Sequence, residues 1–177
     1  MDLLKQFRFT RRFVDDLLSC DNPDFAQYLY RSSVNADGVA GIYPDFLRLS
    51  GEQDSCERVS FLDTWVAFDG RCWYTKTYDK REHPPLSRVA SLKYPHPSCF
   101  ISNRAKFGII TSRLHAFSRV CVRRRDFVTR VRMFLQEFQG RGYSRARVWG
   151  YVRRFVRTVP LPFPVTSPDA LVRELMA

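Results

Sequence analysis

The sequence has no long apolar run, no internal repeat and no low-complexity segment. None of its apolar stretches approaches the roughly 20 residues that a membrane-spanning helix needs. The first residues, MDLLK, do not have the layout of a signal peptide. We therefore expect a soluble, intracellular protein with no membrane partner.

Residue spacings that are typical of zinc and redox sites are also missing. The five cysteines are widely separated and include no Cys-x-x-Cys pair, and the three histidines show no metal-ligand spacing. In an intracellular protein such cysteines are expected to be reduced and mostly buried. The histidines are interpreted as structural.

Acidic residues are scarce in the C-terminal part of the chain. Residues 1–100 carry 13 Lys+Arg against 14 Asp+Glu, whereas residues 101–177 carry 16 against 4. Fifteen of those 16 cations lie between Arg104 and Arg157, and all of them except Lys106 are arginine. Guanidinium groups match phosphate oxygens in a bidentate way, and acidic partners for pairs along a helix are almost absent here. The charge distribution therefore predicts a polyanionic partner.

What is present indicates a folded chain of the α+β class. Apolar residues make up 45% of the sequence and aromatic residues 15%, which is typical of a protein with a packed core. A short helix is predicted over 25–30. Alternating or β-branched residues then predict about three strands, at 46–49, 59–68 and 72–78, with an Asp-Gly turn before the last.

Helical periodicity replaces the strand pattern from Lys106 onward. Apolar residues recur at spacings of three and four, which predicts three consecutive helices up to Phe155. Ser144 is the expected N-cap of the third helix, and the glycines at 140 and 142 end the second. Prolines interrupt regular structure after residue 159, and one or two amphipathic turns are expected over 169–176.

Two adjacent carboxylates, Asp15 and Asp16, lie between short apolar arms at 9–14 and 17–20. The arms predict a tight β-hairpin with both aspartates at its tip. Adjacent carboxylates repel each other unless a cation lies between them, and Mg²⁺ or Mn²⁺ takes such oxygen ligands. A surface turn that contains two aspartates explains the same pattern, because Asp is common in turns.

The sequence around Asp15 and Asp16 resembles a known family. The run Phe13-Val14-Asp15-Asp16 is similar to the aromatic-x-Asp-Asp hairpin of reverse transcriptases, where the hairpin tip lies on the palm. Later segments resemble, in the same order, the reverse transcriptases of Penelope-like and related retroelements. The resemblance runs from Phe9 to Phe155, and its phrases are GIYPDFLRL (41–49), FLDTWVAF (61–68), TKTYDKR (75–81), FGIITSRL (107–114), AFSRVC (116–121), DF (126–127) and GRGY (140–143).

This resemblance implies both an architecture and a set of functional residues. Residues 1–82 would form a partial palm with a small antiparallel sheet and one helix, 83–105 an irregular proline-containing connection, 106–157 a basic, thumb-like helical bundle, and 158–177 a proline-rich tail. Asp15 and Asp16 would be the catalytic ligands of Mg²⁺ or Mn²⁺. An RNA template and a DNA primer would be the partners, and the cations expected to contact their phosphates are Lys76, Lys80, Arg81, Arg113, Arg119, Arg123, Arg124, Arg125, Arg130 and Arg132.

Two parts of a complete polymerase are not found ahead of the hairpin. Family members need a further Asp from an earlier palm strand and fingers that bind the deoxynucleotide. Asp63 follows the hairpin, so we interpret it as structural. We expect the C-terminal portion of a reverse transcriptase, inactive alone. The alternatives are a noncatalytic nucleic-acid-binding module derived from a retroelement, and a protein-interaction domain whose cations face an acidic protein or an anionic membrane.

Overall fold

The computed structural model divides into two compact units, residues 1–53 and 54–177. Both sheets are antiparallel and small, and the helices gather in the second unit, so the predicted α+β class is confirmed. The unit boundary differs from the predicted division after residue 82, because the three-stranded sheet belongs with the helices. The structure describes residues 7–13, 16–20, 22, 24–30, 41–47, 55, 57–80 and 93–177.

The first unit contains the predicted hairpin. Strand β1 (Thr10–Phe13) pairs antiparallel with β2 (Asp16–Ser19), and the hydroxyls of Thr10 and Ser19 are 2.8 Å apart. In this register Asp16 lies opposite Phe13 and begins the second strand, rather than lying in the turn as predicted. Phe9 and Phe13 are more than half exposed, so the apolar arms do not bury the carboxylate of Asp16, which is itself exposed.

A short 3-10 helix, η1 (Phe25–Tyr28), follows in place of the longer helix predicted over 25–30. Its end pairs with a later segment: the amide of Ile42 donates to the Tyr28 carbonyl at 2.9 Å, and a bridge joins Tyr30 to Tyr43. Gly41 makes this approach possible, since a Cβ there would lie 2.0 Å from the Tyr30 carbonyl oxygen.

The second unit opens with a three-stranded meander. Its strands are β3 (Arg58–Phe61), β4 (Thr64–Phe68) and β5 (Trp73–Thr77), paired in that order. The strand predicted over 59–68 is therefore a hairpin, because Leu62 adopts φ 55° and reverses the chain with Asp63. The strand predicted at 46–49 is wrong where it is described: Asp45, Phe46 and Leu47 form a turn and bend after Pro44.

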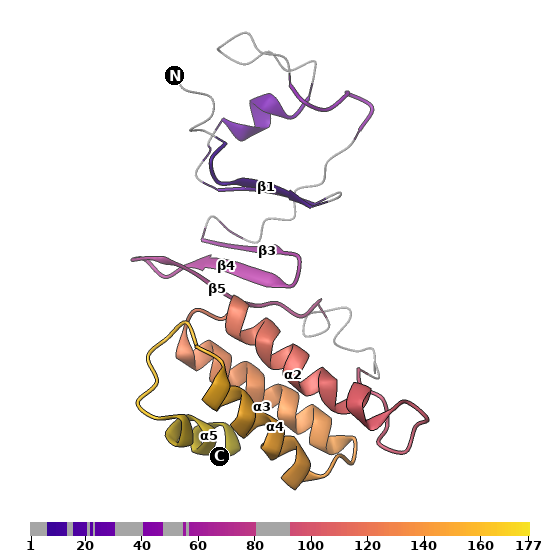
Figure 1. Ribbon diagram of the computed structural model, residues 1–177. Coiled ribbons are helices and arrows are strands. Elements are labelled where there is room, and N and C mark those ends of the chain that lie inside the picture. The colour runs from indigo at the N-terminus through magenta and orange to yellow at the C-terminus, as the bar shows by residue number, and fades with distance from the viewer. Residues whose placement is uncertain are drawn as a thin grey trace. The chain divides into compact units, whose positions relative to one another are not determined.

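Four helices follow the sheet (Figure 1): α2 (Asn103–Val120), α3 (Arg124–Gly140), α4 (Arg145–Thr158) and α5 (Pro168–Met176). Helix α2 begins earlier than Lys106 because the Ser102 hydroxyl accepts a hydrogen bond from the Ala105 amide. Helix α4 begins after Ser144 as predicted. The side chains with the least exposure all belong to this bundle and its connections: Phe127, Phe138, Ile110, Leu114, Leu171, Val131, Val148, Val152 and Cys121.

Helix α5 belongs to the bundle rather than to a separate tail. It packs against α3 and α4, and α2 packs against the same two helices. Leu171, Val172 and Leu175 are buried in the common core, and Phe163 of the proline-containing connection joins them. The Ser167 hydroxyl caps the helix by accepting from the Ala170 amide at 3.1 Å. Within the described ranges, no helix has the length and apolar character needed to cross a membrane.

The sheet is attached to the bundle through β5. The Thr75 hydroxyl donates to the Val120 carbonyl at 2.5 Å, and the Val122 amide donates to the Thr75 carbonyl at 3.3 Å. These bonds satisfy backbone groups where α2 ends. Of the four described cysteines, Cys121 alone is buried and Cys72 is exposed, so the expectation of mostly buried thiols is wrong for this part of the chain.

Candidate nucleic-acid interface

The hairpin carries the residues predicted to be catalytic. Asp16 is exposed at the first position of β2, and Asp15 lies outside the described residues. Among the described residues of the hairpin, Asp16 is the one carboxylate. Across the described part of the chain, no three side chains of His, Cys, Asp or Glu form a group that could hold a metal ion. The structure describes one of the two carboxylates predicted to bind Mg²⁺ or Mn²⁺, so the metal site at Asp15 and Asp16 stays a prediction.

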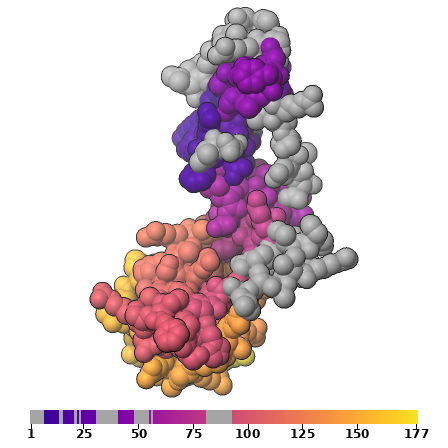
Figure 2. All heavy atoms as spheres, turned by 90° about the vertical axis from the view of Figure 1, so that its right-hand side faces the viewer, coloured from indigo at the N-terminus to yellow at the C-terminus, as the bar shows by residue number. Residues whose placement is uncertain are grey.

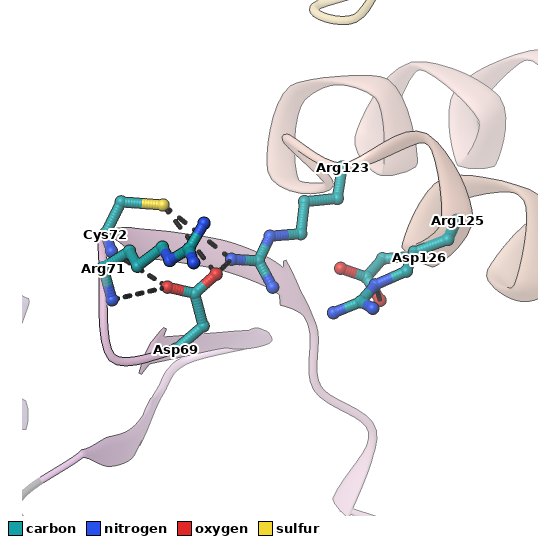
Figure 3. Close-up of polar contacts among 6 residues, drawn as sticks. All are labelled: Asp69, Arg71, Cys72, Arg123, Arg125 and Asp126. Carbon is teal, nitrogen blue, oxygen red and sulfur yellow. Dashed lines mark hydrogen bonds and ion pairs between the residues drawn. The ribbon is translucent and has the colours of Figure 1, made fainter.

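Arg123, predicted to contact phosphate, instead connects the sheet to the start of α3 (Figure 3). Its guanidinium donates to the Asp69 carboxylate in the β4–β5 loop and lies 3.4 Å from the centroid of the Tyr74 ring. The Cys72 and Arg71 amides also donate to Asp69, at 2.9 and 3.0 Å. These two amides, together with Arg123, lower the pKa of the Asp69 carboxyl to about 2.

Arg130 also serves a structural role. Its guanidinium lies 3.0 Å from the carboxylate of Asp79, which is buried after β5. The Lys93 ammonium reaches the same oxygen at 2.7 Å and the Glu137 carboxylate at 3.2 Å. Removing one partner from such a buried group leaves a charge without compensation, so these side chains hold the sheet, the connection and α3 together.

Two further predicted residues bind α5. Arg124 pairs with the Glu174 carboxylate at 2.5 Å. Arg132 donates to the Glu174 carbonyl from Nε and Nη2, at 3.0 and 2.5 Å. The last four carbonyls of a helix have no partner within it, and Arg132 satisfies one of them. Both arginines therefore stabilise the docking of α5 on α3.

The remaining predicted cations differ in exposure. Lys76 is half-buried in β5, and Arg81 lies outside the described residues. The exposed cations are Lys80, Arg113, Arg119 and Arg125. Thus four of the ten predicted contacts face the solvent, and four others pair with groups of the protein itself.

The sequence reasoning named Arg119 but missed three other exposed arginines along the contact between α2 and α4. Phe107 stacks on Tyr151 with centroids 5.3 Å apart, and His115 meets Phe155 at 5.0 Å, so the two helices run side by side in the same direction. Arginines three or four positions from these contacts lie beside the line of contact. They are Arg104 and Arg119 on α2 and Arg147 and Arg154 on α4, all exposed, and we call them the seam arginines.

Neither α2 nor α4 contains an Asp or Glu residue. The face that carries the seam arginines thus has cations and no carboxylate from its own helices. A helix of 18 residues is about 27 Å long, so this face can follow several phosphates of one strand. The sequence already shows this face as two helical stretches without Asp or Glu. Half of the predicted phosphate contacts come instead from the arginine-rich run 123–132.

An open pocket lies along α2. Its volume is about 400 Å³, and it is lined by Lys93, Tyr94, Gly108, Ile109, Ser112 and Arg113. The Lys93 ammonium is already paired with two carboxylates, which leaves Arg113 as the cation that the pocket offers to a ligand. The seam therefore concentrates more positive charge than the pocket does.

Comparison of this chain with protein-family models, with curated proteins and with solved structures gives no match. The geometry and charge of the described residues, together with the order of the sequence phrases, are the basis for assigning a function.

Proposed function

We propose that this chain is the late-palm and thumb-like portion of a reverse transcriptase, and that its helical bundle binds a template–primer duplex through phosphate contacts. The observation that carries the binding function is the acid-free seam between α2 and α4 with its four exposed arginines. The resemblance in the order of sequence phrases supports the family.

The chemistry of the seam favours contact with the backbone over reading of bases. Guanidinium groups bind phosphate oxygens whatever the sequence, and such contacts fix orientation without specifying bases. A duplex of an RNA template and a DNA primer presents phosphates along its whole length, and the seam presents arginines on both of its helices. Binding of this kind releases counterions, so affinity falls steeply with salt.

Paired substitutions with equal change of charge test the seam. Arg104→Gln with Arg147→Gln, and Arg119→Gln with Arg154→Gln, each remove two seam cations. Arg71→Gln with Arg173→Gln removes two exposed cations elsewhere in the second unit. Fluorescence anisotropy with an RNA–DNA duplex, measured over a salt series, gives log Kd against log salt. We expect each seam pair to make the slope shallower by about 2, since one phosphate contact contributes about 1.

The control pair should leave the slope unchanged. Wild-type binding that does not respond to salt, or equal effects of all three pairs, would overturn the assignment to the seam. Tighter binding to acidic liposomes than to the duplex would instead favour the alternative of an anionic surface as partner. Charge reversal at Arg123 or Arg130 is a poor test, because both side chains hold the fold together.

A second candidate function is deoxynucleotidyl transfer in the intact polymerase. The observation in its favour is the hairpin itself, which places the carboxylate of Asp16 in solvent at the start of β2. Asp15 and Asp16 would bind Mg²⁺ or Mn²⁺ together with a carboxylate from an earlier palm strand. The metal, when bound, supplies Lewis-acid stabilisation of the transferred phosphoryl group.

Reconstitution tests this catalytic candidate. We expect primer extension with Mg²⁺ or Mn²⁺ when fingers and early palm are supplied, and its loss in Asp15→Asn and in Asp16→Asn. Asp63→Asn, in the exposed turn between β3 and β4, is the matched control and should keep activity. Extension that survives both hairpin substitutions would remove Asp15 and Asp16 from the mechanism.

A further inference from the structure

Phe100 is the most exposed large apolar side chain among the described residues, at 109% of its reference area, and the neighbouring Ile101 is half exposed. Burial of a Phe side chain is favourable, and Phe100 does not gain this stabilisation among the described residues. Single exposed apolar residues are common on protein surfaces. The surroundings of Phe100 distinguish it from them.

The loop that presents Phe100 is fixed by a buried cation. Lys106 is 3% exposed, and its ammonium donates to the carbonyls of Pro97 and Cys99, at 2.5 and 2.6 Å. The Cys99 amide donates to the His96 carbonyl, and the Tyr143 hydroxyl donates to the Pro95 carbonyl at 2.9 Å. An ammonium buried to hold two carbonyls costs desolvation, and its effect is to fix the backbone on the N-terminal side of Phe100. A loop fixed before binding loses little entropy on binding.

The charge around this loop is positive. Residues 83–125 contain no Asp or Glu, and Arg104 is exposed in the first turn of α2, four residues after Phe100. The N-terminal end of α2 is the positive end of its helix dipole. Tyr143, which holds the loop at Pro95, lies just before α4 and its arginines in the sequence. Figure 2 shows this segment, in rose-red, at the near surface of the helical part.

We propose that Phe100 is a stacking platform for an unpaired nucleobase, adjoining the phosphate-binding seam. This inference rests on the proposed nucleic-acid binding and extends it from phosphates to a base. Phe100 is a planar aromatic ring in a cationic segment without Asp or Glu. Such a ring suits a ligand that has flat, apolar faces and an anionic group attached, and a nucleotide is such a ligand. Stacking tolerates any base, since every base has a π-face. The occupant is the base that follows the end of the duplex in a single-stranded overhang.

Binding of blunt and overhanging duplexes separates stacking from phosphate contact. Two RNA–DNA duplexes are compared with the full chain by anisotropy, one blunt and one with a three-nucleotide overhang. A 2-aminopurine at the first unpaired position reports stacking by its fluorescence. The variants are Phe100→Ala, Phe100→Trp and, as a matched exposed phenylalanine in the first unit, Phe46→Ala.

We expect Phe100→Ala to weaken binding of the overhang duplex about five- to 150-fold, the range that one stacked base gives. Blunt-duplex affinity and the salt slope should stay at wild-type values, and the 2-aminopurine signal of the complex should change. Phe100→Trp should restore affinity, and Phe46→Ala should have no effect. Full overhang affinity in Phe100→Ala, or an equal loss for both duplexes, would overturn the platform while leaving the seam intact. Absence of any salt-dependent binding would overturn the proposed function itself.

Discussion

At the scale of single residues, Leu62 carries the clearest conformational cost in the described part of the chain. It is the one non-glycine residue there with positive φ, at 55°. The left-handed region costs an L-residue roughly 1–2 kcal/mol, because Cβ approaches the following carbonyl oxygen. Since the turn between β3 and β4 has only Leu62 and Asp63 to reverse the chain, the cost cannot be distributed over a longer loop.

Leu62→Gly should therefore stabilise the protein. We expect the free energy of unfolding to rise by about 0.5–1 kcal/mol, because relief of the Cβ contact exceeds the entropy that glycine loses on folding. Urea denaturation followed by tryptophan fluorescence measures the change. Leu62→Val is the matched control and should lower stability, because a β-branched side chain fits positive φ poorly. A loss of stability in Leu62→Gly would contradict the inference that Leu62 is strained at positive φ.

Because of Asp69, we expect the free energy of unfolding to depend on pH. Its carboxyl pKa falls from the ordinary value of 3.8 to about 2 in the folded chain, chiefly because the Cys72 and Arg71 amides donate to it. The ionised form thus favours folding. Its contribution is complete above about pH 4 and disappears as pH falls through about 2.

Denaturation of the wild type and Asp69→Asn from pH 7 to pH 2 tests this dependence. Wild type should be the more stable at neutral pH, with a difference that is level down to about pH 4 and then shrinks toward zero near pH 2. Asp63→Asn, also in an exposed hairpin turn, controls for removal of a surface carboxylate. A difference that persists unchanged at pH 2 would show that the substitution acts through packing instead.

At the scale of elements, the sequence predicts the helices better than it predicts the turns that interrupt strands. The helices in 103–158 follow from apolar spacing, and the fold class is confirmed. The run 59–68 reads as one strand because Leu62 is a poor turn residue, so tertiary pairing outweighed local preference. Arg123 and Arg130, predicted to contact phosphate, pair with carboxylates of the protein for a different reason: a sequence shows how many cations there are, and only the fold shows which ones its few carboxylates occupy.

Helix α5 is the element whose importance the sequence understated. Leu171 has no exposed surface, so Leu171→Ala should lower the free energy of unfolding by about 2–5 kcal/mol through lost burial and a cavity. Chemical denaturation of the whole chain measures the loss. Arg173→Ala, exposed on the same helix, should stay within about 0.5 kcal/mol of wild type. Equal, small effects of both substitutions would mean that α5 does not share the cooperative core.

At the scale of the whole molecule, apolar burial is divided unequally between the two units. The continuous core runs from Tyr94 to Leu175, and the sheet adds Trp65 and Ala67. Among the described residues of 1–53, Tyr28 is the one buried apolar side chain. This one buried side chain among the described residues of 1–53 offsets little of the conformational entropy of folding, whereas 54–177 has a core of ordinary size for a small domain. The seam arginines and Phe100 lie in this second unit.

Residues 54–177 should therefore fold and bind nucleic acid without residues 1–53. We expect a single cooperative urea transition for the fragment, because the sheet, the bundle and α5 share hydrogen bonds and ion pairs across their contacts. Its salt slope for an RNA–DNA duplex should equal that of the full chain, since the seam is complete within it. The matched fragment 1–53 should show no cooperative transition. A folded 54–177 with no salt-dependent binding would place the binding function in the first unit, and the arginines of α2 and α4 would then be solvated surface.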